Sequence, residues 1–287
     1  MRLSCSDYTW PLLPHAAVLD LIRALEFEAV DLGFMTGRSH VRPEAVRDYP
    51  AAAGAAVRRE VEARGLGVAD VFAIPYTDFQ TMSANNPDAR QQARALEFFR
   101  AAVEFCRAVG APGLTTLPGV LFPGDTFAQA LARSADGLSE RVRIAAAAGL
   151  SLSVEPHVES LIDTPDKTVQ LLELVPDLRL TVDHAHYIRG GARQEDVDAL
   201  LPWARHLQCR SGRPGALQVR VDEDTIDFER VVGLLHELHY GGSLAVEFTW
   251  QEWMDCNRVD TVGETALLRD RLRAADQTAR AQVGAGQ

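Results

Sequence analysis

The sequence lacks the features of a secreted or membrane-bound protein. Its four cysteines, Cys5, Cys106, Cys209 and Cys256, form no C-x-x-C pair, and this scattered pattern indicates free thiols rather than a disulfide framework. The first residues contain no basic segment followed by an apolar stretch, so they do not resemble a signal peptide. No apolar run approaches the roughly 20 residues that span a bilayer. We therefore expect a soluble, cytoplasmic protein with no membrane partner.

Phosphate-binding motifs and basic stretches are also missing. Neither G-x-G-x-x-G nor G-x-x-x-x-G-K-[ST] occurs in the opening segments, which argues against Rossmann and P-loop folds. The net charge is −11 and the isoelectric point is near 5.2, and no basic stripe offers a surface for nucleic acid. We expect no nucleic-acid partner, although a local group of arginines could still bind an anionic small molecule.

Short apolar runs alternate with longer stretches of helical periodicity along all 287 residues, of which 47% are hydrophobic. Strands that alternate with helices form parallel sheets, and eight such units without a linker favour a closed barrel. We predict an α/β fold, a single-domain (β/α)8 TIM barrel over residues 1–282, followed by a disordered tail at 283–287. One long helix is expected over Pro43–Arg64, and a hairpin arm within Gly212–Asp227. The eight predicted strands are Leu3–Ser6, Ala29–Phe34, Leu66–Pro75, Gly113–Gly119, Leu150–Pro156, Leu178–His184, Arg205–Arg210 and Ser243–Phe248.

Three of these strands end in the same way, with an acid directly after a valine. The acids are Glu155, Asp183 and Glu247. The ends of parallel strands meet at the mouth of a barrel, where the active site lies. Each acid could instead cap the helix that follows it. Three converging carboxylates would repel one another, and a bound metal ion is the simplest way to balance them.

Further polar side chains accompany these acids. His206 and Gln208 alternate along one strand and therefore share a face. His186 lies just beyond Asp183, and His157 follows Glu155 by two residues. Both could contact a metal or a substrate, or could be solvated loop histidines.

The same segments resemble those of the xylose-isomerase-like TIM barrels, the group of sugar isomerases and epimerases that also includes inosose dehydratase and endonuclease IV. The resemblance in strand order covers nearly the whole chain, and its specific motifs lie in the second half. The motifs are VEPH (Val154–His157), VDHAH (Val182–His186), HLQCR (His206–Arg210) and AVEF (Ala245–Phe248).

The resemblance implies one divalent cation held by four side chains, one from each of the last four strands. The implied ligands are Glu155, Asp183, Gln208 and Glu247. Gln208 stands where the family usually has histidine, and an all-oxygen set favours Mn²⁺ or Mg²⁺ over Zn²⁺. Arg210 stands where an acid is often found.

The resemblance also implies a reaction. The expected function is a metal-dependent isomerase or epimerase that acts on a ketose or related sugar derivative through a metal-stabilised enediolate. Glu155 and Glu247 would be the catalytic acid and base. The side chains expected to bind the substrate are His186, His157, Arg210, Arg213 and His206, and the two arginines would suit a carboxylate or phosphate.

Other functions stay open at this point. The same chemistry serves a lyase, either a dehydratase or a decarboxylase acting on a sugar-derived keto compound. A non-catalytic sugar-binding barrel is a second alternative. A nuclease like endonuclease IV is disfavoured by the negative charge and by the lack of histidines at the ends of the first four strands. Oligomers are common in the family, which suggests a homo-oligomer.

Overall fold

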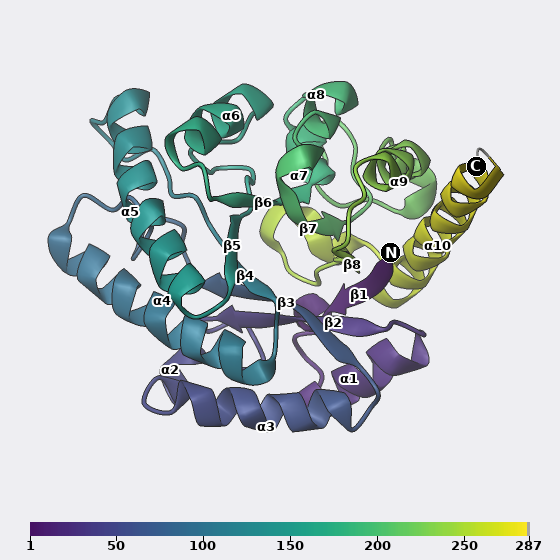
Figure 1. Cartoon of the computed structure of the whole chain (residues 1–287), viewed down its shortest axis with the longest axis horizontal. Coiled ribbons are helices and arrows are strands. Elements are labelled where there is room, and N and C mark those ends of the chain that lie inside the picture. The colour runs from purple at the N-terminus through teal and green to yellow at the C-terminus, as the bar shows by residue number, and fades with distance from the viewer. Residues whose placement is uncertain (286–287) are drawn as a thin grey trace.

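Eight parallel strands close into a barrel in the computed structural model, which describes residues 1–285 (Figure 1). Each strand pairs with the next along the chain, and β1 pairs with β8 to close the sheet. Nearly all strand residues are buried, as expected where helices cover the outer face. The predicted TIM barrel is therefore confirmed. The strands are β1 Arg2–Ser6, β2 Ala29–Met35, β3 Gly67–Ile74, β4 Gly113–Thr116, β5 Ser151–Val154, β6 Arg179–Asp183, β7 Ala204–Cys209 and β8 Ser243–Val246.

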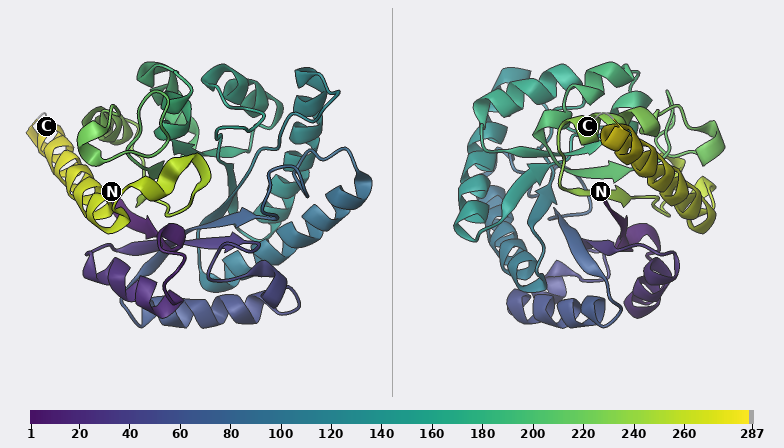
Figure 2. Two further views of the ribbon diagram at one scale, coloured as in Figure 1. Left: turned by 180° about the vertical axis from the view of Figure 1, so that it is seen from behind. Right: turned by 45° about the vertical axis from the view of Figure 1, so that its right-hand side comes forward.

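Helices surround the strands, as the right-hand view of Figure 2 shows. The two longest connecting helices, α4 and α5, begin at side-chain caps: Asp88 accepts from the backbone of α4, and Thr126 forms a capping box with Gln129. The α-helices are α1 His15–Ala24, α2 Pro43–Val46, α3 Pro50–Glu62, α4 Ala89–Val109, α5 Phe127–Ala147, α6 Pro165–Leu174, α7 His184–Arg189, α8 Gln194–Asp198, α9 Phe228–Glu237 and α10 Thr261–Ala285. Short 3₁₀ helices are η1 Asp7–Thr9, η2 Leu201–Trp203, η3 Val221–Glu223 and η4 Trp253–Arg258.

The predicted helix over Pro43–Arg64 is wrong in its continuity. The structure divides it into α2 and α3, and Pro50 is the first residue of α3. Proline has no backbone N–H and restricts the residue before it, so it suits a helix start and interrupts a helix that would run through it.

The predicted hairpin within Gly212–Asp227 is also wrong. The segment contains one isolated bridge, between Arg213 and Ala216, and the short helix η3. Its middle is held by Gln218, whose side-chain amide nitrogen donates to the carbonyl oxygens of Thr249 and Cys256. Its LQVRV stretch therefore forms no strand, and the middle of the segment packs against the β8 loop.

A layer of charged side chains fills the barrel below its mouth. His206 on β7 forms a hydrogen bond with Asp31 of β2, and Arg205 donates to Asp70 of β3 at 2.7 Å. Asp31, Asp70 and His206 could together hold a metal ion, but the two acids already have the histidine and the arginine as partners. Burial alone would lower the pKa of His206, yet Asp31 raises it above its ordinary value. This layer lies below Gln208 in the barrel interior.

The N-terminus of the chain packs against the last helix, α10. The N-terminal amino group lies 3.0 Å from Asp276 of α10, which also contacts His236 of α9. Helix α10 continues to Ala285, and residues 286–287 of the predicted tail lie outside the described residues. No helix within residues 1–285 has the length and apolar character needed to cross a membrane.

Candidate active site

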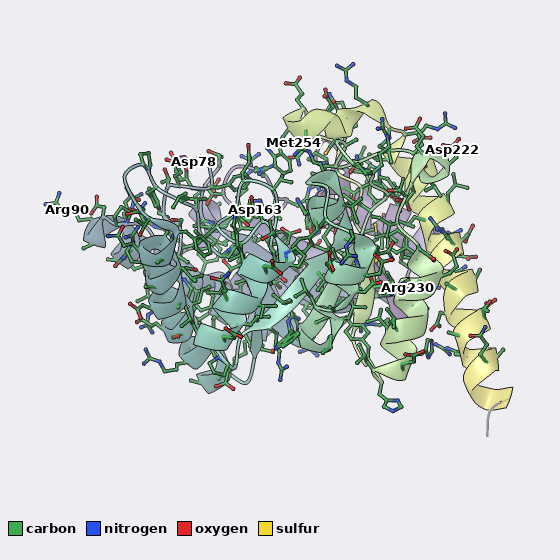
Figure 3. The ribbon with its side chains drawn as sticks, turned by 90° about the horizontal axis from the view of Figure 1, so that it is seen from above. Asp78, Arg90, Asp163, Asp222, Arg230 and Met254 are labelled. Atoms are coloured by element: carbon green, nitrogen blue, oxygen red, sulfur yellow. The ribbon has the colours of Figure 1, made fainter. Side chains whose placement is uncertain are left out.

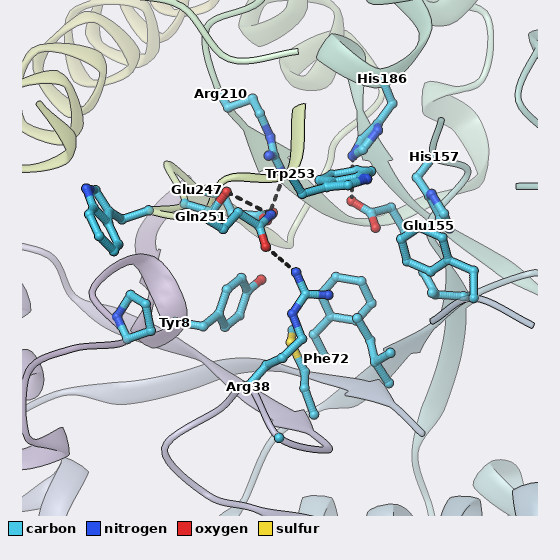
Figure 4. Close-up of a pocket in the computed structure, with 18 of the residues that line it drawn as sticks. Tyr8, Arg38, Phe72, Glu155, His157, His186, Arg210, Glu247, Gln251 and Trp253 are labelled. Carbon is cyan, nitrogen blue, oxygen red and sulfur yellow. Dashed lines mark hydrogen bonds and ion pairs between the residues drawn. The ribbon is translucent and has the colours of Figure 1, made fainter. Parts of the chain in front are cut away.

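A cavity of about 400 Å³ opens at the carboxyl ends of the strands (Figure 4). Its polar side carries Glu155, His157, His186, Arg210 and Glu247, and its other walls are largely aromatic and aliphatic. The strand-end positions therefore converge on one cavity, as the barrel geometry requires. Within it, a group of charged side chains lies beside walls that are mainly apolar.

Of the three acids predicted from the strand ends, Glu155 and Glu247 line the cavity, and Asp183 lies behind its lining against Arg210. Gln208 does not line the cavity either, but it contacts the lining residue Tyr8. Glu155 follows β5, Asp183 ends β6 and Glu247 follows β8, and each is at least 95% buried. Asp183 also caps a helix, because its Oδ1 accepts from the N–H of Ala185 in α7 at 2.9 Å. Capping and site formation are thus compatible, since the two oxygens of Asp183 point to different partners.

Arg210 connects two of the acids. Its Nε donates to Oδ2 of Asp183 at 2.8 Å, and its Nη2 donates to Oε1 of Glu247 at 2.6 Å. Burial would lower the pKa of this guanidinium, but Glu247 and Asp183 raise it. Arg210 is therefore a permanent positive charge inside the acidic cluster.

Three oxygens of this cluster have no hydrogen-bond partner in the described part of the chain, although they are buried. They are Oε1 of Glu155, Oε1 of Gln208 and Oε2 of Glu247. Gln208 is oriented by Tyr8, because its Nε2 donates to the tyrosine hydroxyl at 2.9 Å and leaves its carbonyl oxygen unused. Buried polar atoms without partners are costly and call for a ligand or ion.

The charge balance supports the same interpretation. Glu155, Asp183 and Glu247 carry three negative charges when ionised, and Arg210 supplies one positive charge. Burial and the charge of Asp183 raise the pKa of Glu155 to about 8, and burial raises the pKa of Glu247 well above its ordinary value. A divalent cation would compensate the remaining charge, and the unpartnered oxygens are suitable donors. The residues present therefore fit a metal.

His186 lies close to two of the acids. Its Nε2 is 3.5 Å from Oε1 of Glu155 and 3.6 Å from Oδ2 of Asp183, and the three side chains form a group that could hold a metal ion. Its Nδ1, however, accepts the backbone N–H of Val158 at 3.1 Å. Burial lowers the pKa of His186 to about 3, so the ring is neutral and carries its proton on Nε2. In this state His186 is a hydrogen-bond donor to the site.

Aromatic residues lie beside this centre. The ring of His157 packs 4.5 Å from that of Phe79, and burial lowers its pKa to about 3. The ring of Trp253, in η4, lies 6.4 Å from that of His186. The next residue, Met254, has a φ of 56°, and Figure 3 shows it at the edge of the molecule formed by the loops of the mouth. Backbone strain of this kind is common where a loop must present a side chain to a site.

The structure places the remaining sequence-predicted residues elsewhere. His206 lies in the charged layer below Gln208, and Arg213 is exposed in the loop after β7. Neither lines the cavity. Sequence reasoning did not single out Arg38 or Gln251, which both line it. The sequence indicates only that each residue follows a strand of the barrel, β2 or β8, and many loop residues share such a position.

A barrel with three acids and a glutamine at the carboxyl ends of four adjacent strands defines the class of protein. The chain belongs to the xylose isomerase-like TIM barrel family, whose model matches residues 19–274. The resemblance inferred from the strand-end motifs is thus confirmed.

Individual relatives are more distant. The chain is 25% identical over 204 residues to L-ribulose-5-phosphate 3-epimerase UlaE of Escherichia coli O157:H7; the match covers 65% of this chain and 66% of that protein. A structure of L-ribulose 3-epimerase matches with a TM-score of 0.79 and 15% identity, over 100% of this chain and 98% of that one. The structure of the IOLI protein with a binding zinc atom matches with a TM-score of 0.69 and 15% identity, over 99% and 98%. These structural likenesses establish the fold.

Proposed function

We propose that this protein is a divalent-metal-dependent sugar epimerase or isomerase that acts on a ketose or a related derivative. The observation that carries the proposal is the presence of two similar glutamates, Glu155 and Glu247, on different sides of the cavity. Each is buried, each has a raised pKa and each keeps one oxygen without a hydrogen-bond partner in the described residues. The relative named as a 3-epimerase of L-ribulose 5-phosphate supports the same class.

Glu155, Asp183, Gln208 and Glu247 would hold the ion. When bound, it would act as a Lewis acid that polarises the substrate ketone and makes the neighbouring C–H more acidic. The donors are all oxygens, which favours Mn²⁺ or Mg²⁺ over Zn²⁺. The zinc atom bound by the IOLI protein supports a divalent metal in this fold, and the glutamine predicts a harder ion here.

The two glutamates would move the proton. Glu155 approaches from β5 and Glu247 from β8, so they lie on different sides of the pocket in Figure 4. An ionised carboxylate on one side removes the proton next to the ketone, and a protonated carboxyl on the other side returns one. The Nε2–H of His186 would donate to the developing oxygen charge. Arg210 would hold Asp183 and Glu247 in place.

A lyase reaction would use the same first step. After the proton is removed, loss of a β-hydroxyl gives dehydration, and a keto-acid could instead lose CO₂. The partly buried guanidinium of Arg38 in the cavity would suit the carboxylate of such a keto-acid.

Product analysis separates the outcomes. The metal-loaded protein would be incubated with ketopentoses, ketohexoses, their phosphates and keto-acids, and the products followed by NMR. We expect epimerised or isomerised sugars, abolished by Glu155→Gln and Glu247→Gln but unaffected by Glu173→Gln, an exposed glutamate on α6. Loss of water or CO₂ as the main reaction would favour the lyase. No reaction in the whole panel, with ligand affinity unchanged in both glutamine variants, would favour a binding protein.

The proposal includes a reducing compartment, the cytoplasm. All four cysteines are buried and free, which is typical of proteins kept under reducing conditions. A homo-oligomer stays a prediction from the family.

A further inference from the structure

Arg38 is a cation in the cavity without an acidic partner. It lies in the loop after β2, is partly buried and lines the same cavity as the two glutamates. Its side chain donates one hydrogen bond, from Nη2 to the amide oxygen Oε1 of Gln251 in the loop after β8. No carboxylate of the described residues lies within ion-pair distance of its guanidinium, whereas the partly buried Arg205 and Arg271 each contact an acid.

The absence of a partner is unfavourable for a guanidinium removed from water. Burial lowers the pKa of Arg38, and the charge of Glu247 offsets this only in part. Glu247 itself already accepts from Arg210. The cavity therefore contains a positive charge that its own acids do not neutralise.

A second arginine extends this charge outward. Arg42 lines the same cavity, is exposed and has no ion pair among the described residues. Figure 4 shows Arg38 approaching from the side of the pocket opposite His186, with its guanidinium directed towards Gln251. The acids and the two arginines thus line one cavity with opposite charges.

We infer that Arg38 is the anchor of an anion subsite and that the substrate carries a carboxylate or phosphate group remote from the carbon on which the glutamates act. The inference rests on the proposed function and specifies its substrate class. A guanidinium can donate two parallel hydrogen bonds to either anion. The anion would replace the neutral oxygen of Gln251 as the partner of Arg38, and Arg42 would add positive charge at the entrance.

Three compounds with one carbon skeleton test the inference: D-fructose, D-fructose 6-phosphate and D-fructuronate, which carry a hydroxyl, a phosphate and a carboxylate at the same end. L-ribulose and L-ribulose 5-phosphate form a second pair. Binding to the Mn²⁺-loaded protein would be measured by calorimetry, together with kcat/KM wherever turnover occurs. The variants are Arg38→Met, which keeps the length without the charge, and Arg38→Lys, which keeps the charge. Arg47→Met, at an exposed arginine outside this cavity, is the matched control.

We expect the wild type to bind at least one anionic member more tightly than its neutral counterpart. Arg38→Met should lower the affinity for that anion about 10- to 100-fold, the effect of losing a charge-assisted hydrogen bond. The affinity for the neutral sugar should change by less than about threefold. Arg38→Lys should recover part of the loss, and Arg47→Met should resemble the wild type. The preferred member distinguishes phosphate from carboxylate.

Equal losses for neutral and anionic members in Arg38→Met, or no preference for an anion in the wild type, would overturn the subsite. Turnover that disappears in Glu155→Gln would leave the proposed function standing in either case. Conversely, Arg38-dependent anion binding without any turnover would support the subsite and contradict the epimerase.

Discussion

The Nε atom of Arg210 lies 2.8 Å from Oδ2 of Asp183, and both side chains are almost completely buried. The arginine thereby neutralises part of an acidic cluster from inside. When Glu155 and Glu247 are both ionised, two negative charges remain uncompensated, which matches the charge of one divalent ion. Under the proposed function, the cluster would combine the permanent cation Arg210 with one exchangeable divalent cation.

Removal of this arginine should destabilise the fold. Arg210→Met leaves Asp183 and Glu247 buried without their partner, and breaking a buried ion pair in this way costs about 3–5 kcal/mol. Urea denaturation of the metal-free protein measures the free energy of unfolding. Mn²⁺ should reduce the loss, because the ion takes over part of the charge compensation. Arg193→Met, which removes an exposed pair with Asp196, should cost less than about 1 kcal/mol; a similar value for Arg210→Met would contradict the account.

Gln208 should set the metal preference. Gln208→His replaces an amide oxygen by an imidazole nitrogen, which suits Zn²⁺ better than Mg²⁺. We expect the ratio of Zn²⁺ to Mg²⁺ affinity to rise about tenfold or more, measured by competitive titration with a metal indicator. Tyr8→Phe is the control, because it removes the hydrogen bond to Gln208 and keeps the oxygen ligand. Its preference between the two metals should not change, and an unchanged ratio in Gln208→His would mean that position 208 does not bind the ion.

The stability of the metal-free protein should fall as pH rises. Burial and Asp183 raise the pKa of Glu155 from 4.5 to about 8. The folded state therefore holds a proton that the unfolded state has already lost above pH 4.5. The stability from this proton is fully present below pH 4.5 and disappears as pH rises through about 8. Urea denaturation between pH 5 and 8 measures the free energy of unfolding. This free energy should decline less with pH in Glu155→Gln than in the wild type.

Metal binding should show the opposite trend with pH. The carboxylate form of Glu155 is the ligand, so the affinity for Mn²⁺ should increase up to about pH 8. An affinity that is constant between pH 6 and 8 would place the metal away from Glu155.

His186 should affect turnover more than metal binding. Its Nδ1 is engaged by the backbone of Val158, so Nε2 carries the proton and can donate it in a hydrogen bond. We expect His186→Asn to lower kcat about 100- to 1,000-fold, the usual effect of losing a donor to a developing oxyanion. The Kd for Mn²⁺ should change by less than about threefold. A large loss of metal affinity would instead make His186 a ligand, with its other tautomer.

The sequence predicts most of the fold because its periodicity is simple. Each buried strand is a short apolar run and each helix a longer amphipathic one, so local pattern and barrel geometry agree. The two errors have different causes, one a tertiary contact and the other a local effect of proline. The hydrogen bonds of Gln218 to the β8 loop override a strand-like pattern, and Pro50 divides a stretch that is helical by composition.

Some residues of the candidate site could be predicted from the sequence and others could not. Glu155, Asp183 and Glu247 follow from strand ends, because the fold fixes where strand ends meet. The role of Arg38 could not be predicted, since its hydrogen bond to Gln251 depends on the conformations of two loops, and the two residues are 213 positions apart. The contact of Arg210 with two acids could not be predicted either, since the sequence indicates for this arginine only a contact with the substrate.

The exchange of substrate hydrogen with solvent tests the central claim most directly. The Mn²⁺-loaded protein would be incubated in D₂O with a ketose that it turns over, and NMR would follow deuterium entry next to the ketone. The account predicts deuterium in both epimers for the wild type. Glu155→Gln and Glu247→Gln should each abolish epimerisation, and each should retain exchange at most for the epimer whose proton the remaining glutamate can reach. Epimerisation in the wild type without solvent deuterium, or undiminished turnover in both variants, would contradict a proton-transfer mechanism built on these two glutamates.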